Sequence, residues 1–316
     1  MTTQSMTAGR TSIAVLTEEH PPDPAGRRTR VAELRDQIDE RLLDVGAVLL
    51  RGLGIASAAE FHDVVSCFGE PFAAYHGNSP RTAVQDGVWT STEYPAEYDI
   101  SLHNELSQAS RWPGRLFFCC LSAPESGGST PVSDGRAMLA ALDPAVRSRF
   151  ESRGVAYLQS MHGGFGLGRS WQDTYRTEDR RTVEEYLRVA DAQFSWTDEG
   201  DLRIRQVRPA VRTHPVTGER VWFNQAEQFH VSSLPDTEAQ ALLDLVESEV
   251  ELPQSATFGD GTPIAPDELA HVREVARQNE CAFPWQPGDI LAIDNMLVLH
   301  GRHAYSGARR ILVAMI

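Results

Sequence analysis

The chain has 316 residues, of which 41% are hydrophobic and 23% are charged, and its formal net charge at pH 7 is −15. This composition is that of an ordinary globular protein, and the acidic balance argues against nucleic acid or an anionic membrane as the main partner. No apolar run approaches the roughly 20 residues of a membrane-spanning helix, and the N-terminus lacks the apolar core of a signal peptide. We therefore expect a cytoplasmic protein.

The first part of the chain predicts a polar segment followed by helices around one buried strand. Residues 1–20 are mostly polar, so we expect a flexible segment before a single domain over residues 21–316. Apolar residues at helical spacing within residues 27–53 predict a helix, and the run "GAVLLRG" that follows predicts a short buried strand. A serine in the N-cap position opens a second predicted helix over residues 57–69.

The remainder of the chain alternates short apolar runs with helical segments. Strands are predicted within residues 114–123, 201–214, 220–229 and 285–316, and helices within residues 135–154, 236–250 and 265–280. Glycine, proline and serine turns separate the strands, and no clean domain boundary interrupts them. This pattern predicts an α+β, mainly β fold: a β-sandwich or jelly-roll core, that is a double-stranded β-helix, with flanking helices.

A histidine and a carboxylate lie one residue apart in "SLHNELSQ", residues 101–108. In an extended segment the side chains of His103 and Glu105 point to the same side, so an imidazole nitrogen and a carboxylate oxygen can converge on one metal ion. The pair alone would equally suit a surface turn. A third ligand elsewhere in the chain is needed to decide between the two interpretations.

His300 is the best candidate for that third ligand, because it ends the apolar run "DILAIDNMLVLH". Two imidazoles and one carboxylate form the facial set that leaves positions open on Fe(II), although zinc hydrolases also use such ligands. The helical H-E-x-x-H spacing of those hydrolases is absent. Arg310, ten residues further on in a strand, would suit the far carboxylate of a dicarboxylate co-substrate that chelates the metal through its 2-oxo acid end.

With these residues assembled, the chain resembles the taurine dioxygenase/clavaminate synthase superfamily of Fe(II)/2-oxoglutarate-dependent oxygenases. It is most similar to the branch with an H-N-E ligand motif, which includes syringomycin-type aspartate hydroxylases. The resemblance runs from about residue 30 to the C-terminus. It rests on four stretches: "TSTEYPAEYDISLHNELS", "RLFFCCLSAPESGGSTPVSDGR", "RTHPVTGERVWFNQ" and "WQPGDILAIDNMLVLHGRHAYSGARRILVAM".

The resemblance implies a role for each matched residue. His103, Glu105 and His300 would bind Fe(II), and Arg310 would bind the distal carboxylate of 2-oxoglutarate with help from the Thr130 hydroxyl. Arg309 would face the other way, because neighbouring strand residues alternate. The carboxylate at the second ligand position argues against halogenation, since related halogenases have a small residue there.

The activity implied is a dioxygenase reaction in which O2 and 2-oxoglutarate hydroxylate an aliphatic C–H bond of a small amino-acid-like substrate, free or tethered to a carrier protein, in specialised metabolism. Desaturation and oxidative cyclisation remain open, as does a homo-oligomer. A metal-dependent hydrolase and a non-catalytic jelly-roll binding protein are weaker alternatives. Asn78, Arg81 and Asn224 are the candidate substrate contacts.

Overall fold

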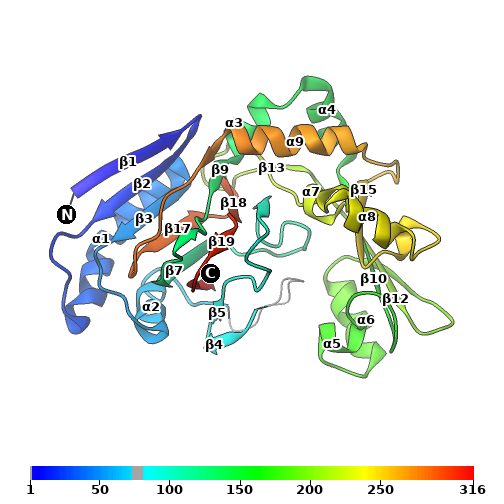
Figure 1. Ribbon diagram of the computed structural model, residues 1–316, viewed down its shortest axis with the longest axis horizontal. Helices are drawn as coiled ribbons and strands as arrows, with labels where there is room; N and C mark the ends of the chain where they lie inside the picture. The colour runs from blue at the N-terminus through cyan, green and yellow to red at the C-terminus, as the bar shows by residue number, and fades with distance from the viewer. Residues whose placement is uncertain (1, 73–80) are drawn as a thin grey trace.

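The computed structural model describes residues 2–72 and 81–316 (Figure 1). Over this part of the chain its largest sheet has eight strands, in the order β1-β2-β3-β17-β7-β20-β5-β4. These strands are β1 (Thr2–Ala8), β2 (Thr11–Thr17), β3 (Ala47–Arg51), β4 (Ala83–Gln85), β5 (Val88–Thr90), β7 (Arg115–Ser122), β17 (Ile290–Asp294) and β20 (Arg310–Met315). Neighbouring strands are antiparallel except β2 and β3, which are parallel.

A second sheet packs against the first and completes the core of the fold. Its described strands are β16 (Glu280–Cys281), β9 (Val132–Asp134), β18 (Val298–Arg302) and β6 (Ile100–His103), in that spatial order. Phe118 and Leu291 of the large sheet share one buried cluster with Val132 and Val298 of the smaller sheet. The predicted jelly-roll core is therefore confirmed.

The opposite face of the large sheet is covered by α1 (Pro24–Val45) and α2 (Ala58–Val65), as Figure 1 shows. Side chains alternate along β7, so that Phe117 and Cys119 pack against these helices while Phe118 and Cys120 face the second sheet. Each face of the large sheet therefore has an apolar partner, which explains why residues 116–121 of β7, "LFFCCL", are all apolar.

The prediction that residues 1–20 form a flexible segment is wrong for residues 2–17. β1 and β2 form an antiparallel hairpin, and β2 pairs with β3 in the large sheet. Ile13 packs into the core between the sheets and Leu16 into the layer beneath α1 and α2, and both side chains are fully buried. Burial of this apolar run on both faces holds the hairpin in place, although β1 itself is polar and largely exposed.

A further described sheet, with the order β11-β12-β10-β15, lies on the right of Figure 1, away from the N-terminus. Its strands are β10 (Val155–Met161), β11 (Gln193–Trp196), β12 (Leu202–Arg208) and β15 (Gln254–Phe258). Two described two-stranded sheets complete the list: the hairpin of β13 (Val211–Thr213) with β14 (Arg220–Trp222), and the pair of β8 (Ser126–Gly127) with β19 (Tyr305–Ser306).

The remaining helices pack around these strands. They are α3 (Gly135–Ala141), α4 (Pro144–Arg153), α5 (Trp171–Tyr175), α6 (Arg180–Val189), α7 (Ala226–Phe229), α8 (Asp236–Leu243), α9 (Pro266–Gln278) and the 3-10 helices η1 (Val231–Ser233) and η2 (Glu249–Glu251). Among the described residues, no helix combines the length and apolar character that crossing a bilayer requires.

Candidate active site

His103, Glu105 and His300 come together between the two sheets of the core. His103 ends β6 and lies directly opposite His300 of β18, so that their ring centroids are 4.4 Å apart. Glu105 follows two residues later, and the ligand atoms of the three side chains all lie within 4.8 Å of one another. All three residues are buried. The cluster thus unites two segments that are almost 200 residues apart in the chain.

Both imidazoles are in the form that binds a metal. Burial lowers the pKa of His103, against the opposing effect of Glu105, and lowers the pKa of His300 well below its usual value, so both rings are neutral at pH 7. The Nδ1 atom of His103 lies 2.8 Å from the carbonyl oxygen of Ser101, which accepts a hydrogen bond from Nδ1–H and leaves the Nε2 lone pair for a ligand. Nδ1 of His300 is buried and has no hydrogen-bond partner among the described residues. Two neutral imidazoles and a carboxylate fit Fe(II).

Glu105 is held in place through its backbone. Its N–H donates to the side-chain oxygen of Asn295 at 2.8 Å, and the amide nitrogen of Asn295 donates back to the Glu105 carbonyl at 2.9 Å. The intervening Asn104 donates from its side chain to the Asn295 carbonyl at 2.7 Å. Asn295 therefore joins the H-N-E segment to the turn that precedes β18.

Arg81 lies beside the cluster. Its guanidinium donates to the Glu105 carboxylate at 2.6 Å, and both side chains are 3% exposed. It also helps to lower the pKa of His300, since a nearby positive charge disfavours protonation of the ring. Of the two candidate substrate contacts that lie among the described residues, the structure brings Arg81 to the cluster. Asn78 lies outside the described residues, so its predicted role stays a prediction.

A narrow cavity runs from the cluster toward Arg309, between Phe118, Thr130 and Ser91. The Arg309 guanidinium donates to the Gly128 carbonyl at 3.0 Å, and it lies 3.3 Å from the Ser91 hydroxyl and 3.4 Å from the Thr130 hydroxyl. Among the described residues, no carboxylate pairs with it. Burial lowers the pKa of Arg309 to about 10, which keeps the group cationic at pH 7. The cavity therefore offers an anionic ligand a buried positive charge.

The structure corrects the choice of arginine. Arg310 is exposed and does not line the cavity, whereas Arg309 does. Ile311 and Val313 of β20 face the core between the sheets, so the strand alternation places Arg309 on the inward side and Arg310 on the outward side. The prediction that Arg310 would reach the co-substrate is wrong, and its neighbour meets the same chemical requirement.

A second, more open cavity of about 290 Å³ adjoins the cluster at Glu105. Thr92 and Ile100 line both cavities, and the open one continues past Gln108, Gln225 and Gln228. The metal cluster therefore lies where the two cavities meet.

Asn224 does not line either of these cavities. Its side-chain nitrogen donates to the Ala210 carbonyl at 3.0 Å, and its side-chain oxygen accepts from the Ala226 N–H at 3.1 Å. The amide thus links the start of α7 to the segment that precedes β13. The predicted substrate contact of Asn224 is replaced by a structural role.

A family model described as "Taurine catabolism dioxygenase TauD, TfdA family" matches residues 25–316. The chain belongs to this family. The dapdiamide synthesis protein DdaC of Enterobacter agglomerans is 37% identical over 280 residues, which cover 88% of this chain and 84% of DdaC. A clavaminate synthase-like protein of Arabidopsis thaliana is 30% identical over 287 residues, covering 88% of this chain and 83% of the plant protein.

Solved structures agree on the fold. PvcB of Pseudomonas aeruginosa, described as an Fe, alpha-ketoglutarate dependent oxygenase from an isonitrile synthetic pathway, matches with a TM-score of 0.56 and 17% identity over 99% of this chain and 90% of PvcB. AAD-2, solved with Mn(II) and N-oxalylglycine, matches with a TM-score of 0.55 and 13% identity over 100% of this chain and 97% of AAD-2.

As a TauD/TfdA family member, this protein is a 2-oxoglutarate-dependent non-haem iron dioxygenase with a small-molecule substrate, and the predicted family, enzyme class and cofactors are confirmed.

Two residues beside the narrow cavity, Arg302 and Trp285, were not predicted from the sequence. The Arg302 guanidinium lines the narrow cavity and donates to the backbone carbonyls of Tyr94, Pro95 and Tyr98, which holds the segment before β6. The indole N–H of Trp285 donates to the Thr130 hydroxyl at 3.2 Å and orients it toward Arg309. The arginine two residues after His300 was a usable signal for Arg302, because strand alternation puts both side chains on one face.

Proposed function

We propose that this dioxygenase hydroxylates an aliphatic C–H bond of a small amino-acid-like substrate, free or tethered to a carrier protein, in specialised metabolism. The observation that carries the proposal is the position of the His103, Glu105 and His300 cluster at the junction of a narrow cationic cavity and an open polar one. The relative DdaC, named for dapdiamide synthesis, supports a biosynthetic role.

The narrow cavity is proposed as the site of 2-oxoglutarate. His103, Glu105 and His300 would hold the metal, and Arg309 with the Thr130 hydroxyl would bind the distal carboxylate of the co-substrate. Bound Fe(II) supplies the redox chemistry, in which O2 converts 2-oxoglutarate to succinate and carbon dioxide and one oxygen atom is left for the substrate. The surrounding residues bind and orient the two organic molecules and exclude water.

The open cavity is proposed as the substrate site. Gln108 is only 9% exposed, and its side-chain oxygen is buried with no hydrogen-bond partner among the described residues. A buried acceptor of this kind costs free energy unless a ligand supplies a donor, which an ammonium or amide N–H would do. Arg81 lines the narrow cavity, but its guanidinium donates to the carboxylate of Glu105, which lines the open one, so Arg81 is the second proposed contact at the metal end of the site.

The experiment that tests this proposal is turnover with Fe(II), 2-oxoglutarate and O2 against free amino acids and carrier-bound aminoacyl thioesters. We expect succinate to form in step with a product that has gained one oxygen atom, and His103→Ala to yield neither. A product that has lost two hydrogens instead would replace hydroxylation by desaturation or ring closure. Turnover with zinc and without 2-oxoglutarate would contradict the proposal and favour a hydrolase.

A further inference from the structure

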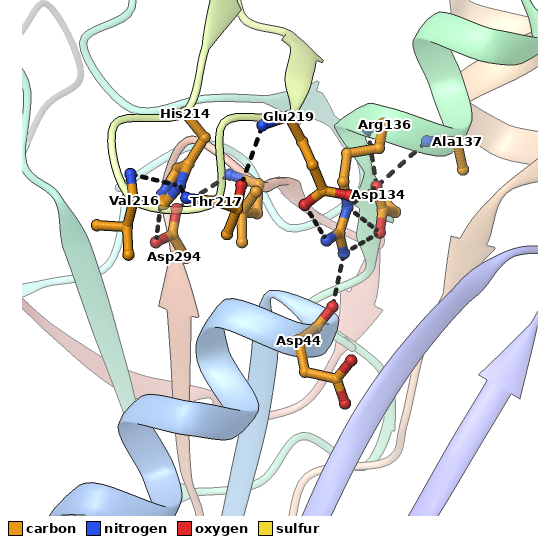
Figure 2. Close-up of polar contacts among 10 residues, drawn as sticks. Asp44, Asp134, Arg136, Ala137, His214, Val216, Thr217, Glu219 and Asp294 are labelled. Atoms are coloured by element: carbon orange, nitrogen blue, oxygen red, sulfur yellow. Dashed lines mark hydrogen bonds and ion pairs between the residues drawn. The ribbon is translucent and has the colours of Figure 1, made fainter.

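A buried histidine and aspartate form a pair outside both cavities (Figure 2). His214 begins the turn that joins β13 to β14, and Asp294 ends β17. Nε2 of His214 lies 3.2 Å from a carboxylate oxygen of Asp294, and the two residues are 4% and 7% exposed. Neither residue lines the cavities of the active site.

The contacts of His214 determine where its proton lies. The backbone N–H groups of Val216 and Thr217 point at Nδ1, at 3.4 and 3.1 Å. A ring nitrogen that accepts from N–H groups carries no proton, so the proton of the neutral ring is on Nε2. That N–H donates to Asp294. His214 therefore closes its own turn with one nitrogen and holds Asp294 with the other.

Asp294 in turn shapes the segment between β17 and β18. Its other carboxylate oxygen accepts from the N–H groups of Met296 and Leu297 at 2.9 and 3.0 Å. Within this turn lies Asn295, which is fully buried and exchanges two hydrogen bonds with the backbone of Glu105. His300 follows on β18. One turn therefore sets the position of Glu105 through Asn295 and of His300 through the chain itself.

We propose that His214 is a positioning residue for the metal cluster: through Asp294 and Asn295 it fixes the spacing between Glu105 and His300. The inference rests on the proposed metal site, and it adds a residue from the β13–β14 turn to that site's support. Residues that do not bind the metal but orient its ligands commonly matter for affinity: their loss weakens metal binding about 10–100-fold.

The same turn offers a matched control. At its far end the carboxylate of Glu219 binds Arg136 at 2.9 Å, and Arg136 also binds Asp134 at 2.7 Å and the carbonyl oxygen of Asp44 (Figure 2). Glu219→Gln weakens this second anchor and leaves the contact with Asp294 intact. If His214 only stabilised the turn, loss of either anchor would have a similar effect.

Two substitutions of His214 separate its two nitrogens. In His214→Asn the amide oxygen occupies the place of Nδ1, so the turn keeps its acceptor while Asp294 loses its donor. In His214→Gln the amide nitrogen reaches the place of Nε2, so Asp294 keeps its donor while the turn loses its acceptor. Each variant therefore loses the hydrogen bonds of one ring nitrogen. Only His214→Asn removes the donor to Asp294, the residue that shapes the turn around Asn295.

The experiment is titration of the whole chain with Mn(II), without 2-oxoglutarate or O2, for the wild type and each variant, with thermal unfolding of the metal-free proteins alongside. We expect His214→Asn to bind Mn(II) about tenfold more weakly. His214→Gln and Glu219→Gln are expected to keep the wild-type affinity to within about a factor of two, well short of the 10–100-fold loss. Equal affinity of His214→Asn and wild type, or an equal loss in Glu219→Gln, would overturn the inference.

Should His214→Asn fail to fold, Asp294→Asn takes its place, because it keeps an oxygen for the turn and sets an amide nitrogen against the imidazole N–H. The same tenfold loss is expected there, and wild-type affinity would refute the positioning role. A wild-type chain that binds Mn(II) no better than His103→Ala would instead overturn the metal site itself.

Discussion

The two ends of the active site are built from different kinds of structure. At the co-substrate end His300 lies on the paired strand β18, while Arg309 and Thr130 lie one and two residues before the paired strands β20 and β9. At the substrate end Gln108 and Gln225 lie in a turn and at the start of a short helix.

This difference suggests how a single fold can keep the same co-substrate while its substrate differs from one enzyme to another. Residues on a paired strand, or within two residues of its end, have little freedom to move, so they suit a co-substrate of constant shape. Turns and short helices accept replacement more easily, and specificity is commonly carried there. Four substitutions, taken from the largest expected effect to the smallest, would break or sharpen this comparison.

Removal of a metal ligand should have the largest effect, because both ends of the site meet at the cluster. We expect His103→Ala to lower metal affinity by more than the roughly 10–100-fold typical of an outer partner, and to abolish succinate production. Mn(II) titration and a succinate assay measure the two effects. His20→Ala, at an exposed histidine, is the control and should behave as wild type. Retained succinate production in His103→Ala would remove His103 from the ligand set.

Arg309→Met should have the next largest effect, because it would leave the distal carboxylate of 2-oxoglutarate buried without a counter-charge. Breaking a buried charge pair costs about 3–5 kcal/mol, and we expect 2-oxoglutarate binding to weaken by that order while metal binding persists. The measurement is the KM for 2-oxoglutarate. Arg310→Met is the matched control, one residue away on the exposed side, and a larger loss there would reverse the assignment.

Thr130→Val tests the hydroxyl that lies beside Arg309 at the co-substrate end. The substitution removes a hydroxyl beside Arg309 and leaves the indole N–H of Trp285 without its acceptor. A hydrogen bond to a charged group contributes about 1.5–3 kcal/mol, so we expect a weaker loss of 2-oxoglutarate affinity than in Arg309→Met. Thr130→Ser should restore most of it. Wild-type affinity in the valine variant would show that the hydroxyl supports only Trp285.

Gln108→Leu tests the substrate end and should have the smallest effect. One neutral hydrogen bond contributes about 0.5–1.5 kcal/mol, so the KM for the substrate should rise by that order. The KM for 2-oxoglutarate in the same variant is the internal control and should not change. A rise in the 2-oxoglutarate KM with an unchanged substrate KM would contradict the division of the site into two ends.

The sequence predicted the metal cluster because its residue types and their order along the chain carry the chemistry. It could not distinguish Arg309 from Arg310. The following residues "ILVAM" are apolar on both faces of β20, because Ile311 and Val313 face the second sheet and Leu312 faces α1 and α2. A strand buried on both sides has no polar alternation to show which arginine points inward.

The other errors have equally local causes. Polar β1 suggested flexibility, whereas the apolar run in β2 is the pattern of a buried strand. Asn224 resembled a binding residue because its partner Ala210, on a neighbouring strand connection, cannot be identified from sequence. The His214 and Asp294 pair was hidden for the same reason: the two residues are 80 positions apart, and only the fold joins them.

A crystal structure of the wild-type chain grown without O2 in the presence of Mn(II) and 2-oxoglutarate tests the central claim most directly. The metal should be bound by His103, Glu105 and His300, with the far carboxylate of 2-oxoglutarate against Arg309. Metal bound by other side chains, or a co-substrate carboxylate held by a residue other than Arg309, would contradict the account.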